Sequence, residues 1–262
     1  MLRIAEQPYV KYGAKEERKL WECAPNAGRA VLKKIERILA AATRRGHRAG
    51  ESPAQWAGHL AALLPAPQRV QAAGRQPALP CEQLPAFMAA LRRRAPSPSS
   101  SALQFLILTA ARSGEVRKAT WSEIDLARGL WTIPAERMKA GRDHRVALPE
   151  AAQQLLKATP PVAGTDLIWP GKGLREPLSD MTVAALVKKL HAAEVKAGSS
   201  GWLDPRSGKP AVPQGFRPTF RDWAAEQTAY PAEMAELALA HEVGSAVERA
   251  YRRGEVASVN EV

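Results

Sequence analysis

The stretch SALQFLILTAARSGEV, residues 101–116, joins a nearly continuous apolar run to a charged turn. A helix that is apolar on every side is buried on every side, so we expect residues 103–111 to lie at the centre of a helical domain. Arg112 follows this run directly, and Glu115 comes three residues later. A guanidinium held in this way suits two phosphate oxygens, although an Arg–Glu pair also fits a purely structural helix end.

Downstream of this turn the sequence predicts a small β-sheet. Residues 130–133 and 144–148 are β-prone, and a proline and a charged, glycine-containing stretch separate them, which predicts a hairpin with a basic tip. Lys139 belongs to that tip. Helical patterns cover residues 82–94, 99–111, 179–196, 216–228 and 231–240, and residues 198–213 have the composition of a loop. The predicted fold class is therefore mainly α with a small β-sheet (α+β).

Upstream of the apolar run the sequence predicts a smaller helical domain. Apolar residues recur at helical spacing from Val31 to Leu39, basic side chains occupy the other faces, and Gly46 ends the helix. A second apolar helix is expected after Ser52 and Pro53. Four prolines lie in residues 65–80, and they disfavour helix on both sides. We therefore predict a helical domain over residues 1–64, a linker over 65–80 and a second domain over 81–262.

The charge of the chain indicates a polyanionic partner. The 262 residues carry 38 Lys and Arg against 26 Asp and Glu, a net charge of +12, and the isoelectric point is near 10. Residues 1–78 hold 14 basic and 6 acidic side chains, so the smaller predicted domain is the more basic. Such a surface favours nucleic acid over acidic proteins or neutral metabolites, and binding to it is expected to depend steeply on salt.

Composition also excludes several classes of protein. The two cysteines, Cys23 and Cys81, cannot build a disulfide framework or a multi-cysteine zinc module, and no other metal cluster is visible. The longest apolar run is about half of what a bilayer requires, and the N-terminus lacks a signal pattern. We expect a cytoplasmic protein with no membrane span, no metal and no cofactor.

Three further segments place an Arg, a His or a Tyr among small apolar residues. Gln214-Gly-Phe-Arg217 opens a predicted helix, whose positive N-terminal end suits an anion. His241 ends an apolar helical stripe, and Tyr251 follows ten residues later among arginines. Taken singly, a surface arginine, a structural histidine and a packing tyrosine are the simpler interpretations.

Taken together, the order and spacing of these segments resemble the tyrosine recombinase, or phage integrase, family, and most closely its prophage and genomic-island members. The family pattern has an Arg in a G/A-x-R-x-x-E/D turn, a Lys on a β-hairpin, an H-x-x-R helix start, an L-x-H-x-x helix end and a Tyr nine or ten residues later. The matching positions are Arg112, Glu115, Lys139, Gln214, Arg217, His241 and Tyr251. The match extends over nearly all of residues 79–254, through segments such as TAARSGEVRKATWSEIDL (109–126) and ALAHEVGSAVERAYRRG (238–254). A weaker match, mainly ESPAQWAGHLAALLP (51–65), resembles the same enzymes' core-binding domain.

The resemblance implies a site-specific recombinase of a prophage or other mobile element, which integrates or excises that element. It would cleave and rejoin DNA through a covalent 3′-phosphotyrosyl intermediate, with Tyr251 as the nucleophile. Arg112 and Arg217 would stabilise the phosphate charge, His241 would hydrogen-bond the phosphate, and Lys139 would act as the general acid. This chemistry requires neither metal nor cofactor.

The resemblance also implies partners for the chain. These are double-stranded DNA, further copies of the chain in a tetramer on that DNA, and an accessory DNA-bending protein, all in the bacterial cytoplasm or nucleoid. We expect the two domains to bind the duplex mainly through phosphate contacts. The residues expected to contribute are Arg44, Arg45, Arg142, His144 and Arg145.

The chain departs from the family pattern at one catalytic position and at its ends. Position 214 carries glutamine where the family mostly has histidine, and glutamine cannot transfer a proton at neutral pH. The sequence starts without an arm-binding domain and stops eleven residues after Tyr251. A catalytically impaired or truncated integrase that only binds DNA is therefore an alternative, and a relaxing activity like that of type IB topoisomerases is a third.

Overall fold

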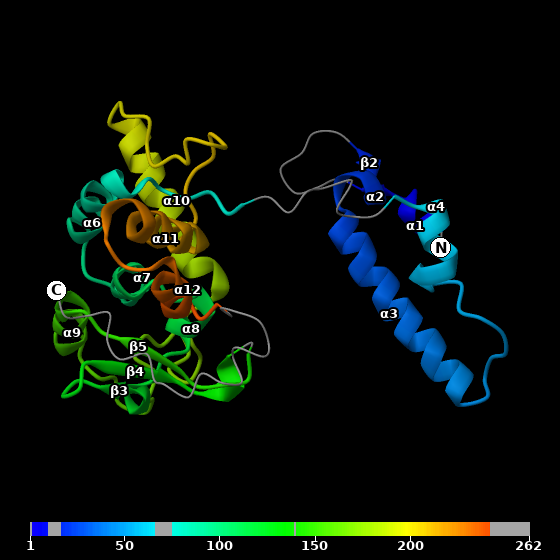
Figure 1. Cartoon of the computed structure of the whole chain (residues 1–262), viewed down its shortest axis with the longest axis horizontal. Helices are drawn as coiled ribbons and strands as arrows, with labels where there is room; N and C mark the ends of the chain where they lie inside the picture. The colour runs from blue at the N-terminus through cyan, green and yellow to red at the C-terminus, as the bar shows by residue number, and fades with distance from the viewer. Residues whose placement is uncertain (1, 10–16, 66–74, 139, 242–262) are drawn as a thin grey trace. The chain divides into compact units, whose positions relative to one another are not determined.

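The computed structural model describes residues 2–9, 17–65, 75–138 and 140–241 of a chain that divides into two compact units, residues 1–75 and 76–262 (Figure 1). The last residues of the predicted linker belong to the second unit. The Val212 amide donates to the Pro77 carbonyl at 3.2 Å, and the Thr219 hydroxyl donates to the Leu79 carbonyl at 2.6 Å. Leu79 is itself fully buried. The linker is therefore shorter at its C-terminal end than predicted, because proline removes a donor but leaves carbonyls free to accept.

The first unit is built around one long helix. Its elements are α1 (Leu2–Ala5), β1 (Pro8–Tyr9), β2 (Arg18–Lys19), α2 (Leu20–Cys23), α3 (Pro25–Arg44), a π-helical turn (Trp56–Leu60) and α4 (Ala61–Leu63). The rings of Trp21 and Trp56 stack at 5.7 Å and cover Leu32 and Leu60 in a small core. The helix ending at Arg44 is confirmed. The second predicted helix is confined to residues 56–63, and the pairing of β1 with β2 was not predicted.

The second unit contains the predicted hairpin. Strands β3 (Ile124–Asp125), β4 (Leu130–Ile133) and β5 (His144–Ala147) form an antiparallel sheet in the order β3-β4-β5. Trp131 and Ile133 of β4 are fully buried and alternate with partly exposed neighbours, as expected of a strand with one covered face. The sequence predicted β4 and β5 but not the short β3.

Helices make up the rest of this unit (Figure 1). They are α6 (Leu84–Arg92), α7 (Pro98–Thr109), α8 (Ser113–Arg117), α9 (Glu150–Lys157), α10 (Asp180–Lys196), α11 (Phe216–Gln227) and α12 (Ala232–Ala238), with 3-10 turns at Cys81–Gln83, Trp121–Glu123, Ala135–Arg137 and Pro213–Gly215. Helix α7 contacts α6, α8, α9 and α10, which confirms that the apolar run is central. Its Phe105 is fully buried, with Trp131 at 5.2 Å and Trp169 at 5.0 Å between ring centroids. The sequence did not predict α8 and α9 as helices.

Across the described residues, every helix is too short or too polar to cross a bilayer.

Candidate active site

Arg112 is fixed at the point where the buried helix α7 ends. Ala110 adopts a left-handed conformation, with φ of 49°, and turns the chain out of α7 into the short helix α8. The Glu115 carboxylate accepts hydrogen bonds from the Arg112 main-chain nitrogen and from its Nη1, both at 2.8 Å. The Glu115 side chain is 8% exposed and that of Arg112 is 31% exposed. The predicted pair is therefore present, and it leaves part of the guanidinium open to an anion from solvent.

Arg217 lies in the first turn of α11 and is only 5% exposed. Its Nη1 donates to the Ala110 carbonyl at 2.7 Å, and its Nη2 donates to the Leu239 carbonyl. Those carbonyls lie at the C-terminal ends of α7 and α12, where the helix dipoles favour a positive charge. Burial, and then the neighbouring Arg112 guanidinium, lower the pKa of Arg217 to about 10, so the side chain stays charged at neutral pH.

His241 completes a short chain of polar contacts that ends on Arg217. Its Nδ1 lies 2.5 Å from Oε2 of Glu236, and its Nε2 lies 3.4 Å from Nη2 of Arg217. A guanidinium can only donate, so Nε2 accepts and the proton resides on Nδ1, which donates to the carboxylate. Both ring nitrogens of His241 are therefore engaged. The sequence pattern pointed to His241 but missed Glu236, which comes five residues earlier.

His144, which the sequence grouped with surface contacts to DNA, is half-buried at the start of β5. His144 pairs with the fully buried Ile133, and strand alternation puts it on the same face of β5 as the buried Val146. Arg145, which alternates with it, is exposed. The order of residues in the strand, His-Arg-Val-Ala, was the signal that could have placed the imidazole on the covered face.

The pKa of His144 is shifted by burial and by several charged and main-chain groups. Burial is the main cause that lowers its pKa, and Arg112 and Arg217 lower it further. The Glu115 carboxylate and a hydrogen bond to the main chain of Ala238 act in the opposite direction. His144 therefore lies within electrostatic reach of both arginines and next to the end of α12.

A third arginine, Arg137, joins the β4–β5 connection to α8. It donates to the main-chain carbonyls of Glu115 at 2.5 Å and of Lys118 at 2.8 Å, and it pairs with the Glu123 carboxylate. Glu123 also accepts a hydrogen bond from Nε1 of Trp131 at 2.9 Å. This network sets the base of the hairpin against the turn that carries Glu115. The sequence analysis did not single out Arg137.

The remaining predicted site residues are not brought into the cluster by any described contact. Gln214 lies in the 3-10 turn before α11, is half-buried, and makes no side-chain hydrogen bond within the described ranges. The next residue must be glycine, because a Cβ on Gly215 would lie 1.9 Å from the Pro77 carbonyl. The side chains predicted to contact DNA, Arg44, Arg45, Arg142 and Arg145, are all exposed. Lys139 and Tyr251 lie outside the described residues.

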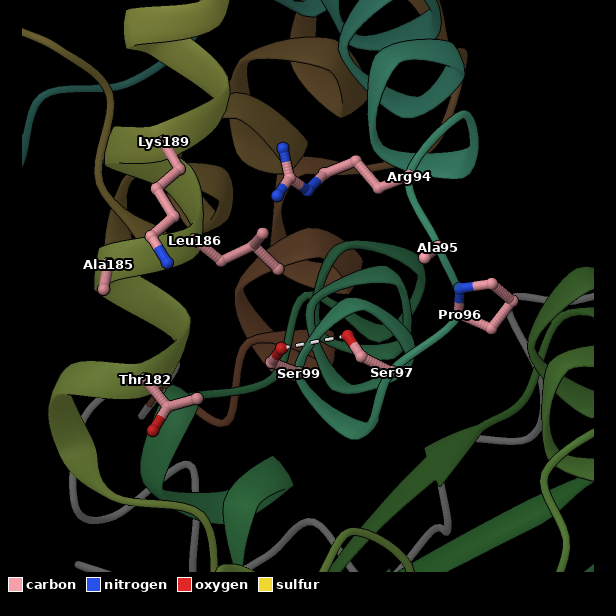
Figure 2. A pocket seen from close by; sticks show the side chains of 9 residues that line it. All are labelled: Arg94, Ala95, Pro96, Ser97, Ser99, Thr182, Ala185, Leu186 and Lys189. Atoms are coloured by element: carbon pink, nitrogen blue, oxygen red, sulfur yellow. Dashed lines mark hydrogen bonds between the residues drawn. The ribbon is translucent and has the colours of Figure 1, made fainter.

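A surface pocket of about 400 Å³ lies apart from the arginine cluster, between α10 and the connection from α6 to α7. Arg94 and Lys189 extend into it from opposite sides, above a hydrogen bond of 3.1 Å between the hydroxyls of Ser97 and Ser99 (Figure 2). None of the predicted site residues lines it. In the arginine cluster itself, Arg112 is partly exposed and Arg217 is buried.

One group of potential metal ligands occurs among the described residues, and it also lies outside the cluster. Donor atoms of Cys81, Glu82 and Glu226 lie within 4.8 Å of one another, and both glutamates are exposed. The Cys81 thiol already donates to Glu82 and accepts from Gln227.

The fold matches those of solved integrase structures. A lambda integrase tetramer bound to a Holliday junction superposes with a TM-score of 0.55 at 19% identity, covering 85% of this chain and 60% of that chain. The Tn1549 transposon integrase in complex with transposon right end DNA gives a TM-score of 0.55 at 12% identity, covering 83% of this chain and 71% of that chain. The fold is therefore that of a tyrosine recombinase.

Sequence comparison identifies the family. Prophage integrase IntA of Escherichia coli (strain K12) is 33% identical over 182 residues, which are 68% of this chain and 40% of the relative. The integrase of Enterobacteria phage P4 is 28% identical over 190 residues, 67% of this chain and 40% of the relative. The phage integrase family pattern matches residues 78–257, and the chain belongs to this family. The predicted resemblance is thus confirmed, and the match spans about 40% of the length of these relatives.

Proposed function

We propose that this chain is a site-specific DNA recombinase that cleaves and rejoins DNA through a covalent 3′-phosphotyrosyl intermediate. The observation that carries the proposal is the pair of Arg112 and Arg217, two guanidiniums brought together from sequence positions more than a hundred residues apart, in a chain of the phage integrase family. Two fixed cations, of which Arg112 is partly exposed to solvent, suit the phosphodiester of a DNA backbone.

The chemistry follows from the charges that the reaction creates. When a tyrosine oxygen attacks a phosphodiester, the pentavalent transition state carries additional negative charge on its non-bridging oxygens. Arg112 and Arg217 would stabilise this charge without reorganising, because Glu115 and two helix-end carbonyls already hold them. Tyr251 is the nucleophile in this proposal, and Lys139 protonates the departing 5′-oxygen. When DNA binds, Nε2 of His241 exchanges its 3.4 Å contact with Arg217 for a protonated contact to the phosphate. Gln214, three residues before Arg217, contributes a hydrogen bond and no proton transfer.

We propose the partners of this chain from its net positive charge and from a solved integrase structure of similar fold. A net charge of +12 and exposed arginines at the end of α3 and on the hairpin favour double-stranded DNA. The lambda integrase in the first structure is a tetramer on a Holliday junction, which supports assembly of several copies of this chain on DNA. We further propose that residues 1–64 act as the core-binding domain, that residues 81–262 act as the catalytic domain, and that an accessory DNA-bending protein and a cytoplasmic, nucleoid location complete the system.

The second candidate function is DNA binding without cleavage, and Gln214 is the observation that favours it. General acid–base assistance contributes about 10²–10⁴-fold to such reactions, so its loss at one position could leave a protein that only occupies its site. This candidate predicts salt-sensitive binding, because each phosphate that the protein neutralises steepens the fall of log affinity with log salt concentration by about 0.9. Replacing Arg44 and Arg45 by alanine is expected to make that fall less steep under both functions.

A covalent trapping experiment separates the two candidates. The chain is incubated with nicked suicide duplexes made from the DNA that flanks its gene, and the products are separated under denaturing conditions. We expect a protein–DNA adduct from the unaltered chain and none from Tyr251→Phe, which lacks only the attacking oxygen. Salt-sensitive binding with no adduct from the unaltered chain would leave DNA binding as the function.

A further inference from the structure

We propose that Glu236 is a positioning residue of the active site, which holds the His241 ring with a proton on Nδ1 and stabilises the imidazolium that donates from Nε2 to a bound phosphate. The orientation of the ring is a property of the free protein. Its protonation on DNA binding rests on the proposed recombinase function. None of the motifs in the sequence includes Glu236.

The first argument is the pair of contacts that the Glu236 carboxylate makes. Its Oε2 lies 2.5 Å from Nδ1 of His241, and its Oε1 lies 3.8 Å from Nη1 of Arg221. Glu236 belongs to α12 and Arg221 to α11, so each carboxylate oxygen has its own partner, which limits rotation of the group. The side chain of Glu236 is 31% exposed and that of His241 is 43% exposed. The ring is therefore held on one side and remains partly open to solvent.

The second argument is the hydrogen-bonding capacity of the ring. In the free protein Nε2 of His241 lies 3.4 Å from Nη2 of Arg217, which can only donate. Nε2 therefore accepts, and the ring proton lies on Nδ1, toward Glu236. A phosphate oxygen can only accept, so Nε2 needs a proton before it can donate to one. The partner of Nε2 thus changes from a donor to an acceptor when a phosphate binds.

The third argument concerns how Nε2 gains that proton. If the existing proton moved from Nδ1 to Nε2, the lone pair of Nδ1 would face a carboxylate oxygen of Glu236 at 2.5 Å. Two acceptors in contact repel each other and are left unsatisfied. A second proton, taken from solvent, instead gives an imidazolium whose Nδ1 keeps its hydrogen bond to Glu236. A hydrogen bond between charged partners is roughly twice as strong as a neutral one.

Glu236 also offsets the charge that this second proton adds. An imidazolium at position 241 lies beside the Arg217 guanidinium, and the two positive charges oppose each other. Burial is the main cause that lowers the pKa of Arg217, and the Glu236 carboxylate acts in the opposite direction. Glu236 therefore supports a positive charge on both side chains, and a bound phosphate adds to that support. The balance is one proton from solvent onto Nε2, while Nδ1 keeps its own.

Selective 15N labelling of the histidine rings tests the orientation in the free chain at pH 7.5. A ring nitrogen that carries a proton resonates well apart from one that does not, and the loss of signals in His241→Gln assigns the ring. We expect a proton on Nδ1 in the unaltered chain and in Glu236→Gln, whose amide oxygen also accepts. Glu236→Ala should lose this preference. Unchanged ring signals of His241 in Glu236→Ala would overturn the positioning role.

The same labelling in a DNA complex tests the second proton. A duplex made from the DNA that flanks the gene is bound to Tyr251→Phe, so that no cleavage occurs. We expect both ring nitrogens of His241 to be protonated in this complex. With Glu236→Gln added, a single proton on Nε2 should remain, because the glutamine amide can turn and donate to Nδ1. Equal numbers of ring protons in the two complexes would overturn the role of the carboxylate charge.

The rate of adduct formation tests whether Glu236 acts through His241. We expect Glu236→Ala to slow covalent trapping by about 10²-fold, the loss that a displacement of ~1 Å in a site can cause. In a chain that already carries His241→Ala, the same change should cost no more than about twofold, because no imidazole is left to position. Glu226→Ala removes an exposed carboxylate of the same unit and is the matched control, with the unaltered rate expected. Equal losses from Glu236→Ala in the two backgrounds would overturn the proposal.

Failure of this inference and failure of the recombinase function give different results. If the unaltered chain forms no adduct, the recombinase function fails, while the spectra of the free chain still decide whether Glu236 orients His241. If adducts form and Glu236→Ala changes neither the ring signals nor the rate, Glu236 has no positioning role.

Discussion

Arg217→Lys is expected to lower the rate of covalent adduct formation by about 10²–10³-fold, the usual loss when one preorganised donor to a developing oxyanion is removed. The lysine keeps the positive charge but has a single nitrogen. Its three N–H bonds share one atom, so it loses the planar fork whose Nη1 and Nη2 reach the Ala110 and Leu239 carbonyls from separate positions. Rates are measured by single-turnover trapping on a suicide duplex at saturating protein.

The same substitution is also expected to lower the free energy of unfolding. A buried acceptor left without its partner costs about 1–3 kcal/mol, and Arg217 serves two carbonyls. The free energy of unfolding of the variant is therefore measured in urea, and rates are compared at a temperature at which the variant is folded. Arg175→Lys, at an exposed position of the same unit, is the matched control and should change neither rate nor stability. A folded Arg217→Lys protein with the rate of the unaltered chain would contradict the role assigned to Arg217.

Arg112→Lys is expected to slow adduct formation by about 10²-fold while changing stability less than Arg217→Lys does. Arg112 is partly exposed and is held by Glu115, so a lysine can keep the ion pair. It loses the planar fork that can donate to two oxygens of one phosphate. Two quantities are measured for Arg112→Lys: the rate constant of the adduct-forming step and the free energy of unfolding. Comparing them separates a loss of phosphate binding from a loss of stability.

The double variant Arg112→Lys with Arg217→Lys tests whether both side chains act on the same phosphate. Groups that stabilise one transition state as a unit are strongly non-additive, so the double variant should lose little more than the worse single variant. A loss equal to the product of the two single losses would mean that the arginines act independently. Arg112 and Arg217 would then not act on one phosphate as a single site.

Sequence reasoning succeeded where short-range patterns carry the information. The apolar run before Arg112 predicted a buried helix, and the spacing of Arg112 and Glu115 predicted the contact that holds the guanidinium. The β-prone segments on either side of the basic tip predicted the hairpin. In each case the residues that interact lie within a few turns or one hairpin of each other, so periodicity and turn chemistry were sufficient.

Other parts of the site depend on distant segments of the chain, and no local pattern specifies them. The Arg217 guanidinium meets a carbonyl 107 residues earlier in the sequence. Arg137 reaches main-chain carbonyls of another element, and His144 approaches the end of α12 across the molecule. The hydrogen bond from the Thr219 hydroxyl to the Leu79 carbonyl likewise joins segments 140 residues apart. Motif order indicated which residues matter, and packing determined what each of them contacts.

The central claim, a covalent bond between Tyr251 and a DNA 3′-phosphate, is tested most directly by locating the attached nucleotide. The trapped adduct is digested with nuclease and protease, and the tyrosine-containing peptides are analysed by mass spectrometry. The chain has four tyrosines: Tyr9, Tyr12, Tyr230 and Tyr251. We predict a nucleotide, linked through its 3′-phosphate, on the Tyr251 peptide alone. A nucleotide on any other tyrosine, or an adduct that persists in Tyr251→Phe, would contradict this account.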